Sequence, residues 1–87
     1  MALDNRARLD PDQRRAIIIS TAERIACERG LACVSPDSVA AAVRDVKTSV
    51  GTVRKYFRRR LDLWRAVARV TKDKSVKDQA RTLGVLR

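Results

Sequence analysis

The sequence predicts a small all-α domain of four to five helices with a central helix-turn-helix. The 87 residues leave room for one domain. Apolar residues recur at helical spacing along most of the chain, and no segment alternates apolar and polar residues as a half-buried strand does. Hydrophobic residues make up 45% of the sequence and aromatic residues only 3%, so aliphatic side chains must fill most of the core.

The first helix is expected from Asp10 to about Arg29. Asp10 can cap free amides at its start, and Pro11 suits the first turn. Gly30 is placed to end the helix. Its apolar residues fall at i, i+4, i+7 and i+8, which builds one buried stripe of Ile18, Ala22, Ile25 and Ala26. Residues 1–9 have mixed charge and no periodicity, which indicates an N-terminal arm.

Two short helices joined by a tight turn are expected next. Ser35 is the predicted cap of the earlier helix and Pro36 its first residue. Thr48 and Ser49 offer hydroxyls that can cap the later helix, which is expected from about Val50 to Phe57. The residues expected to face the core are Val39, Ala40, Val43, Val53 and Phe57.

A fourth helix is expected after the three arginines at 58–60 and should run to about Lys74. Its predicted inward stripe consists of Leu63, Trp64, Val67 and Val70. Residues 10–74 would then form the main domain and 75–87 a helical tail. That tail either opens a fifth helix, with Val76, Ala80 and Leu83 on one face and Gly84 as its stop, or continues the fourth helix.

The charge of the chain is concentrated in its second half. Met1 to Val43 holds 6 basic and 6 acidic residues, whereas Arg44 to Arg87 holds 14 basic and 4 acidic ones. The second half therefore carries the whole formal charge of +10. Such asymmetry attracts a polyanion, with nucleic acid the leading candidate and a membrane surface the second.

Several other classes are disfavoured by the residues present. Cys27 and Cys33 lie six residues apart and the chain has no histidine, so no metal site or cofactor is expected. Both cysteines are interpreted as small core residues of a protein in the reducing cytoplasm. No signal pattern or run of 18 apolar residues predicts export or a membrane partner. Without a nucleophile elbow, phosphate loop or acid-base carboxylate pair, the chain is not expected to be an enzyme.

The helix expected at 50–57 has the composition that reading a DNA groove requires. The major groove is about 12 Å wide and admits one helix with small or polar residues facing the bases. Thr52, Arg54 and Lys55 are the candidates for base-edge contacts. Ser49 can cap the helix or donate to a phosphate, and the Tyr56 hydroxyl can reach a phosphate unless the ring is packed inward. The predicted DNA-binding residues are Lys47, Thr48, Ser49, Val50, Gly51, Thr52, Arg54, Lys55, Tyr56, Arg58, Arg59 and Arg60.

The same segment resembles a known family. The pattern Ser49-x-Gly51-Thr52-Val53-x-x-Tyr56-Phe57-x-x-Arg60-x-x-Leu63 is similar to the recognition segment of tetracycline-repressor-type (TetR) regulators. Upstream, Ile18-x-x-x-Ala22-x-x-x-Ala26-x-x-x-Gly30 resembles the first helix of that family. The resemblance covers about Arg14 to Val70 and implies that Arg60 matches a phosphate-binding lysine. Arg54 stands where the family usually has tyrosine. No counterpart of the ligand-binding domain follows Lys74, so no small-molecule inducer is expected.

The sequence therefore predicts a sequence-specific, double-stranded-DNA-binding transcriptional regulator. A repressor is favoured over an activator because blocking a promoter requires binding alone. The sequence leaves open whether the chain forms a homodimer. If it does, its operator should have two half-sites about 10 bp, or a multiple of that distance, apart. The alternatives are a phage DNA-packaging or replication accessory protein similar to a terminase small subunit, and a polymerase-binding or RNA-binding regulator.

Overall fold

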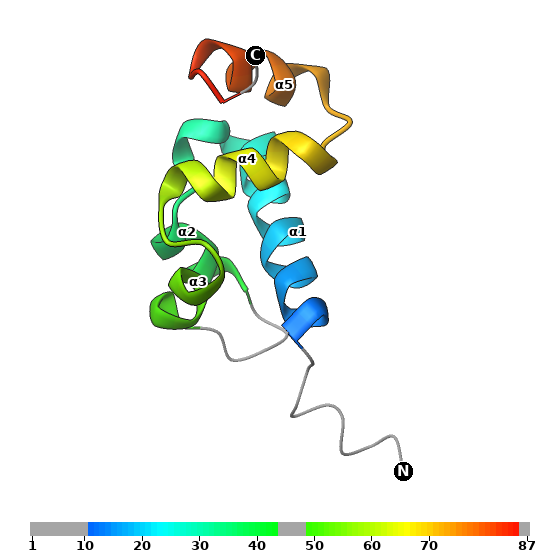
Figure 1. Cartoon of the computed structure of the whole chain (residues 1–87). Coiled ribbons are helices and arrows are strands. Elements are labelled where there is room, and N and C mark those ends of the chain that lie inside the picture. The colour runs from blue at the N-terminus through cyan, green and yellow to red at the C-terminus, as the bar shows by residue number, and fades with distance from the viewer. Residues whose placement is uncertain (1–10, 44–48, 86–87) are drawn as a thin grey trace.

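A computed structural model describes residues 11–43 and 49–85 and shows an all-α fold (Figure 1). Within these two ranges there are five α-helices, one short 3-10 helix and no strand, which confirms the predicted fold class. The elements are α1 (Pro11–Arg29), η2 (Leu31–Cys33), α2 (Pro36–Ala42), α3 (Val50–Tyr56), α4 (Arg60–Val70) and α5 (Lys74–Thr82). Asp10, the expected cap of the first helix, lies outside the described residues.

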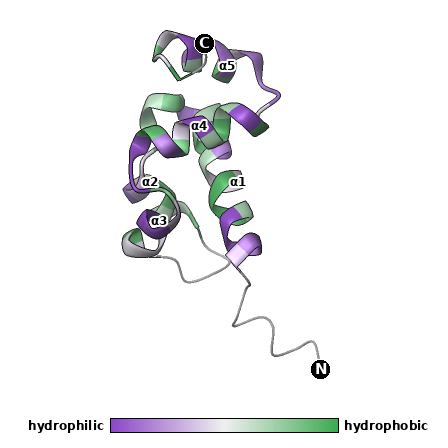
Figure 2. Cartoon of the chain, viewed as in Figure 1, coloured by the Kyte–Doolittle hydropathy of each residue, from purple (hydrophilic) through white to green (hydrophobic). Residues whose placement is uncertain are grey.

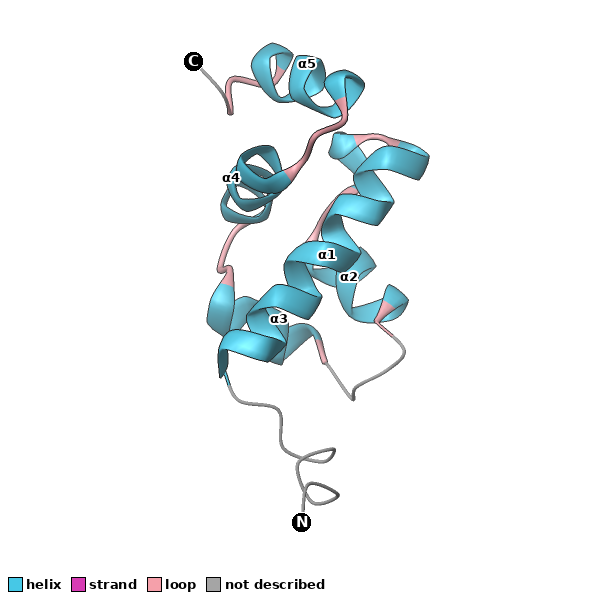
Figure 3. Cartoon of the chain, turned by 90° about the vertical axis from the view of Figure 1, so that its right-hand side faces the viewer, coloured by secondary structure: helices cyan, strands magenta, loops and turns pink. Residues whose placement is uncertain are grey.

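The core forms where α1, α2, α3 and α4 meet. All four residues of the predicted α1 stripe are buried, and they pack with apolar residues from every other helix. Figure 2 shows how hydrophobic and hydrophilic stretches alternate along α1 and α4. In both Figure 1 and Figure 3, α5 lies at the end of the molecule opposite α3. The largest fully buried side chains are those of Ile18, Leu31, Leu63, Val34, Val39, Val53, Val67 and Val76.

The short helix α2 starts as its sequence predicts. The Ser35 hydroxyl accepts a hydrogen bond of 3.1 Å from the Ser38 amide, and the Ser38 hydroxyl accepts one of 2.9 Å from the Ser35 amide. This reciprocal capping satisfies two amides that a helix start otherwise leaves free. Pro36 occupies the first helical position, where a missing amide hydrogen costs nothing.

The predicted extent of the fourth helix is wrong, because α4 ends at Val70 rather than near Lys74. Thr71 has extended backbone angles, and the Asp73 carboxylate accepts hydrogen bonds from the amides of Ser75 (2.8 Å) and Val76 (3.2 Å). Asp73 therefore caps a new helix, and of the two alternatives for residues 75–87 the fifth helix is the one present.

Two apolar residues expected to face the core are exposed instead. Val70, the last residue of α4, is 47% exposed, and Leu83, which follows the end of α5, is 40% exposed. Gly84 ends α5 as predicted, with a φ of +79°. Its turn lets the Val85 amide donate to the Ala80 carbonyl at 2.7 Å, so that Val85 rather than Leu83 packs toward the core.

The interpretation of the cysteines as core residues is also wrong. Cys27 and Cys33 are both free and exposed. Cys27 directly follows Ala26, the last residue of the buried stripe on α1. Because Cys27 is not part of this stripe, it lies on the exposed side of the helix. Partial desolvation, and after it the negative charge of the nearby Asp73 carboxylate, raises the pKa of the Cys27 thiol.

Candidate nucleic-acid interface

Helix α3 has one face in the core and the opposite face in solvent. Val53 is buried within the helix, and Phe57, which follows its last turn, is 4% exposed. Because successive helical residues are rotated by about 100°, the direction opposite to these two side chains belongs to Gly51 and Lys55. Both are exposed and lie four residues apart, so they are one turn apart on the same face.

The start of α3 is fixed by Ser49. Its hydroxyl accepts a hydrogen bond of 3.1 Å from the Thr52 amide and lies 3.1 Å from the Thr52 hydroxyl. Of the two roles expected for Ser49, the structure shows the cap. Thr52 is half-buried and its hydroxyl already has a partner, so the long exposed side chains of this helix are those of Arg54 and Lys55.

The other predicted DNA-binding residues divide by exposure. Val50 and Tyr56 are half-buried, and Tyr56 packs against the core. Exposed positions on this part of the chain are Ser49, Gly51, Arg54, Lys55, Arg58, Arg59 and Arg60. Lys47 and Thr48 lie outside the described residues. The structure thus places seven of the predicted residues at exposed positions between residues 49 and 60, interrupted by the buried Val53 and Phe57.

The turn expected between α2 and α3 falls on residues 44–48, which lie outside the described residues. Helix α2 ends at Ala42 and α3 begins at Val50, so residues 43–49 separate the two helices. The two helices nevertheless pack against each other. The described ends of this connection agree with the prediction, because Val43 has the extended backbone angles of a helix end and α3 starts at the Ser49 cap.

The three arginines at 58–60 join α3 to α4. All three are exposed, and among the described residues no acidic side chain forms an ion pair with them. The guanidinium carbon of Arg60 lies 5.9 Å from the centre of the Trp64 ring, which holds this side chain on the surface of α4. The Arg59 amide donates to the Asp62 carboxylate at 3.3 Å, which fixes the turn into α4.

Two contacts that the sequence does not predict hold this surface in place. The Trp64 indole nitrogen donates a hydrogen bond of 2.9 Å to the Val34 carbonyl and thereby ties α4 to the segment before α2. The guanidinium carbon of Arg15, on α1, lies 5.1 Å from the centre of the Phe57 ring at the end of α3. Their partners lie 30 and 42 residues apart, so no local pattern could reveal them. The one available signal was that a tryptophan packed against a core needs a partner for its N–H group.

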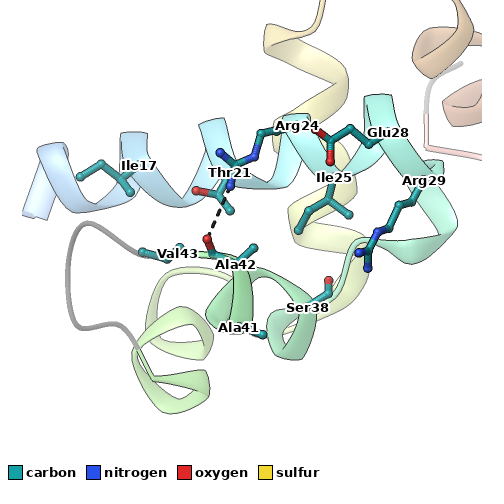
Figure 4. Close-up of a pocket in the computed structure, with 10 residues that line it drawn as sticks. All are labelled: Ile17, Thr21, Arg24, Ile25, Glu28, Arg29, Ser38, Ala41, Ala42 and Val43. Carbon is teal, nitrogen blue, oxygen red and sulfur yellow. Dashed lines mark hydrogen bonds between the residues drawn. The ribbon is translucent and has the colours of Figure 1, made fainter.

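Helix α1 also contacts the end of α2, beside an open groove of about 600 Å³ (Figure 4). An Arg24 guanidinium nitrogen lies 3.5 Å from the carbonyl oxygen of Ala42, the last residue of α2. A cation at this position interacts favourably with the negative end of the helix. Arg24 therefore links α1 to the residue from which the chain departs toward α3.

In the part of the chain that the structure describes, no helix is long and apolar enough to cross a membrane. Nor do three or more acidic or cysteine side chains gather there as metal ligands would. Compared with known proteins, the chain matches no protein-family model, no curated protein and no solved structure.

Proposed function

We propose that this chain is a sequence-specific, double-stranded-DNA-binding transcriptional regulator that acts as a repressor in the cytoplasm. The observation that carries the proposal is the combination of α3 and residues 58–60. A short helix turns Gly51 and Lys55 outward while three exposed arginines follow directly at its end. A helix in the major groove flanked by cations on the phosphates has this arrangement.

The chemistry of the exposed face supports duplex DNA in particular. Arg54 and Lys55 can donate to guanine O6 and N7. Gly51 has no side chain, which allows the backbone of α3 to approach base edges closely. The resemblance of residues 49–63 to the recognition segment of TetR regulators supports the same placement. An RNA duplex is disfavoured because its major groove is too narrow for a helix.

Selection of bound fragments from random duplex DNA tests this proposal. The full chain is expected to enrich one sequence, and Lys55→Ala should lose that preference. Lys72→Ala, which removes an exposed cation from the connection between α4 and α5, is the matched control and should enrich the same sequence. Enrichment of no sequence, or an equal affinity for duplex RNA, would refute the proposal.

Sedimentation of the complex distinguishes the repressor from a DNA-packaging protein. A repressor is expected to bind as one or two copies per selected duplex, and a two-fold symmetric sequence would accompany two copies. A ring of many copies on DNA would instead favour the packaging alternative.

A further inference from the structure

A second surface, distinct from the proposed DNA-reading face, lies between the first half of α1 and the length of α4. It is an open groove of about 360 Å³ that starts beside Tyr56 and Phe57 and extends to Val70 at the end of α4. Figure 3 shows α1 and α4 on either side of this region, with α3 below them. The groove therefore runs from the end of α3 toward α5.

The floor of the groove is apolar. Ile19 contributes from α1, and Ala66 and Val70 lie four residues apart on α4. Ile19 and Ala66 are only partly buried, and Val70 is the most exposed large hydrophobic residue among those the structure describes. A ligand that covers these side chains gains the free energy of removing them from water.

The walls of the groove are cationic. Arg65 and Arg69 lie four residues apart on the outer side of α4, and Arg15 stands across from them on α1. The single acidic group in the lining is Asp62, which already accepts the Arg59 amide. Neither Arg65 nor Arg69 has an ion-pair partner within residues 11–43 and 49–85. Three positive charges and one negative charge therefore surround an apolar strip.

We propose that this groove binds an acidic amphipathic helix of a partner protein. Apolar residues at i, i+4 and i+7 of such a helix would cover the floor, while its carboxylates would pair with the arginines on either side. The 11 residues of α4 span about 16 Å, which corresponds to three turns of a partner helix. The proposal does not depend on the proposed DNA-binding function.

Other occupants fit the groove less well. Duplex DNA offers phosphates to the arginines but nothing apolar for Ile19, Ala66 and Val70. A second copy of this chain would bring a further charge of +10, and its α4 and α5 have basic exposed faces. An acidic helix with an apolar stripe matches both the charge and the floor.

Selection of random 15-residue peptides displayed on phage against the full chain tests the proposal. Enriched peptides are expected to be acidic with helical apolar spacing. Synthetic versions are then titrated by fluorescence anisotropy against the wild type and against Arg65→Glu/Arg69→Glu, for which we expect at least tenfold weaker binding. The control Lys72→Glu/Lys74→Glu makes the same change of net charge at two other exposed positions and should change the affinity less than twofold.

The apolar floor is tested in the same way. Val70→Ser should weaken peptide binding, whereas Leu83→Ser, at the other large exposed hydrophobic residue, should not. Exchanging the peptide's glutamates for lysines should restore binding to Arg65→Glu/Arg69→Glu, and circular dichroism confirms that each variant is folded. The proposal would be overturned if each control variant weakened peptide binding as much as the variant it is paired with. It would be overturned equally if no acidic amphipathic peptides were enriched.

Discussion

The side chain of Gln79, in the middle of α5, accepts a hydrogen bond of 2.6 Å from the backbone amide of Leu31. Leu31 is fully buried and directly follows Gly30, at which α1 has ended. Its amide has left the helix and would otherwise lack a partner. The two residues are 48 positions apart in the sequence, so this bond fastens the last helix of the chain to the end of the first.

Replacing Gln79 should therefore destabilise the whole fold. Gln79→Ala leaves the Leu31 amide part-buried without its partner, which costs about 1 to 3 kcal/mol of unfolding free energy. Urea denaturation measures the change. Asp78→Ala is the matched control at the adjacent exposed position, where loss of the 3.8 Å pair with Arg81 should cost less than about 1 kcal/mol. If the two variants were equally stable, the bond to Leu31 would not support the fold.

Gly30→Ala should be more harmful than Gly84→Ala. Gly30 has φ +102° and ψ 152°, a region open essentially to glycine alone, and residues with side chains pay about 1 to 3 kcal/mol there. A Cβ at this position would also lie 3.3 Å from the Gln79 side-chain oxygen. Gly84 has φ +79° and open space around it, so its substitution costs only the strain of a left-handed backbone conformation. Thermal unfolding of both variants checks the order, and the reverse order would contradict it.

Gly51→Ala should increase stability and decrease DNA affinity at the same time. A Cβ at Gly51 would meet only the Ser49 hydroxyl oxygen, at an ordinary 3.6 Å, and alanine in a helix is favoured over glycine by about 0.5 to 1 kcal/mol. The added methyl group would stand on the face that we propose approaches the bases. Thermal unfolding and an anisotropy titration with the selected duplex measure the two effects. Unchanged affinity would show that this face does not approach DNA closely.

Loss of Arg58 or Arg59 should change the salt dependence of DNA binding. With six to eight phosphates neutralised, the log-log slope of affinity against salt should be about −5 to −7. Arg58→Gln and Arg59→Gln should each reduce its magnitude by about 1 and weaken binding to all sequences alike. Lys72→Gln is the control and should leave the slope unchanged. A wild-type affinity that did not depend on salt would contradict the assignment of these arginines to phosphates.

Alkylation of Cys27 should require a higher pH than alkylation of the same thiol in the unfolded chain. Desolvation, followed by the Asp73 carboxylate, raises the pKa of this thiol in the folded chain. The contribution of the thiol to stability is therefore present below its pKa in the unfolded chain, and is lost as the pH rises through its pKa in the folded chain. Rates of reaction with iodoacetamide in a Cys33→Ser background measure the pKa. Asp73→Asn removes the charge but keeps a good helix cap, and should lower the pKa. An unchanged rate profile in that variant would exclude the carboxylate as a cause.

Local sequence patterns were sufficient to place most of the helices. The stripe from Ile18 to Ala26, the Ser35 and Pro36 start of α2 and the glycine stops each act within a few residues, where hydrogen bonding and helical spacing alone decide the outcome. The same local reasoning predicted that the arginines at 58–60 are exposed, because Val53 in the short helix before them and Phe57 directly after it are the residues that face the core.

Only the tertiary structure decided which distant segments meet. The Leu31 amide finds Gln79, the Trp64 indole finds the Val34 carbonyl, and Arg15 finds the Phe57 ring, each across 30 or more residues. Whether Val70, Leu83 and the two cysteines face the core depended likewise on where α4 and α5 end and what packs beside them. Burial is a property of the assembled helices, since a single helix presents a stripe but does not determine which part of that stripe a neighbour will cover.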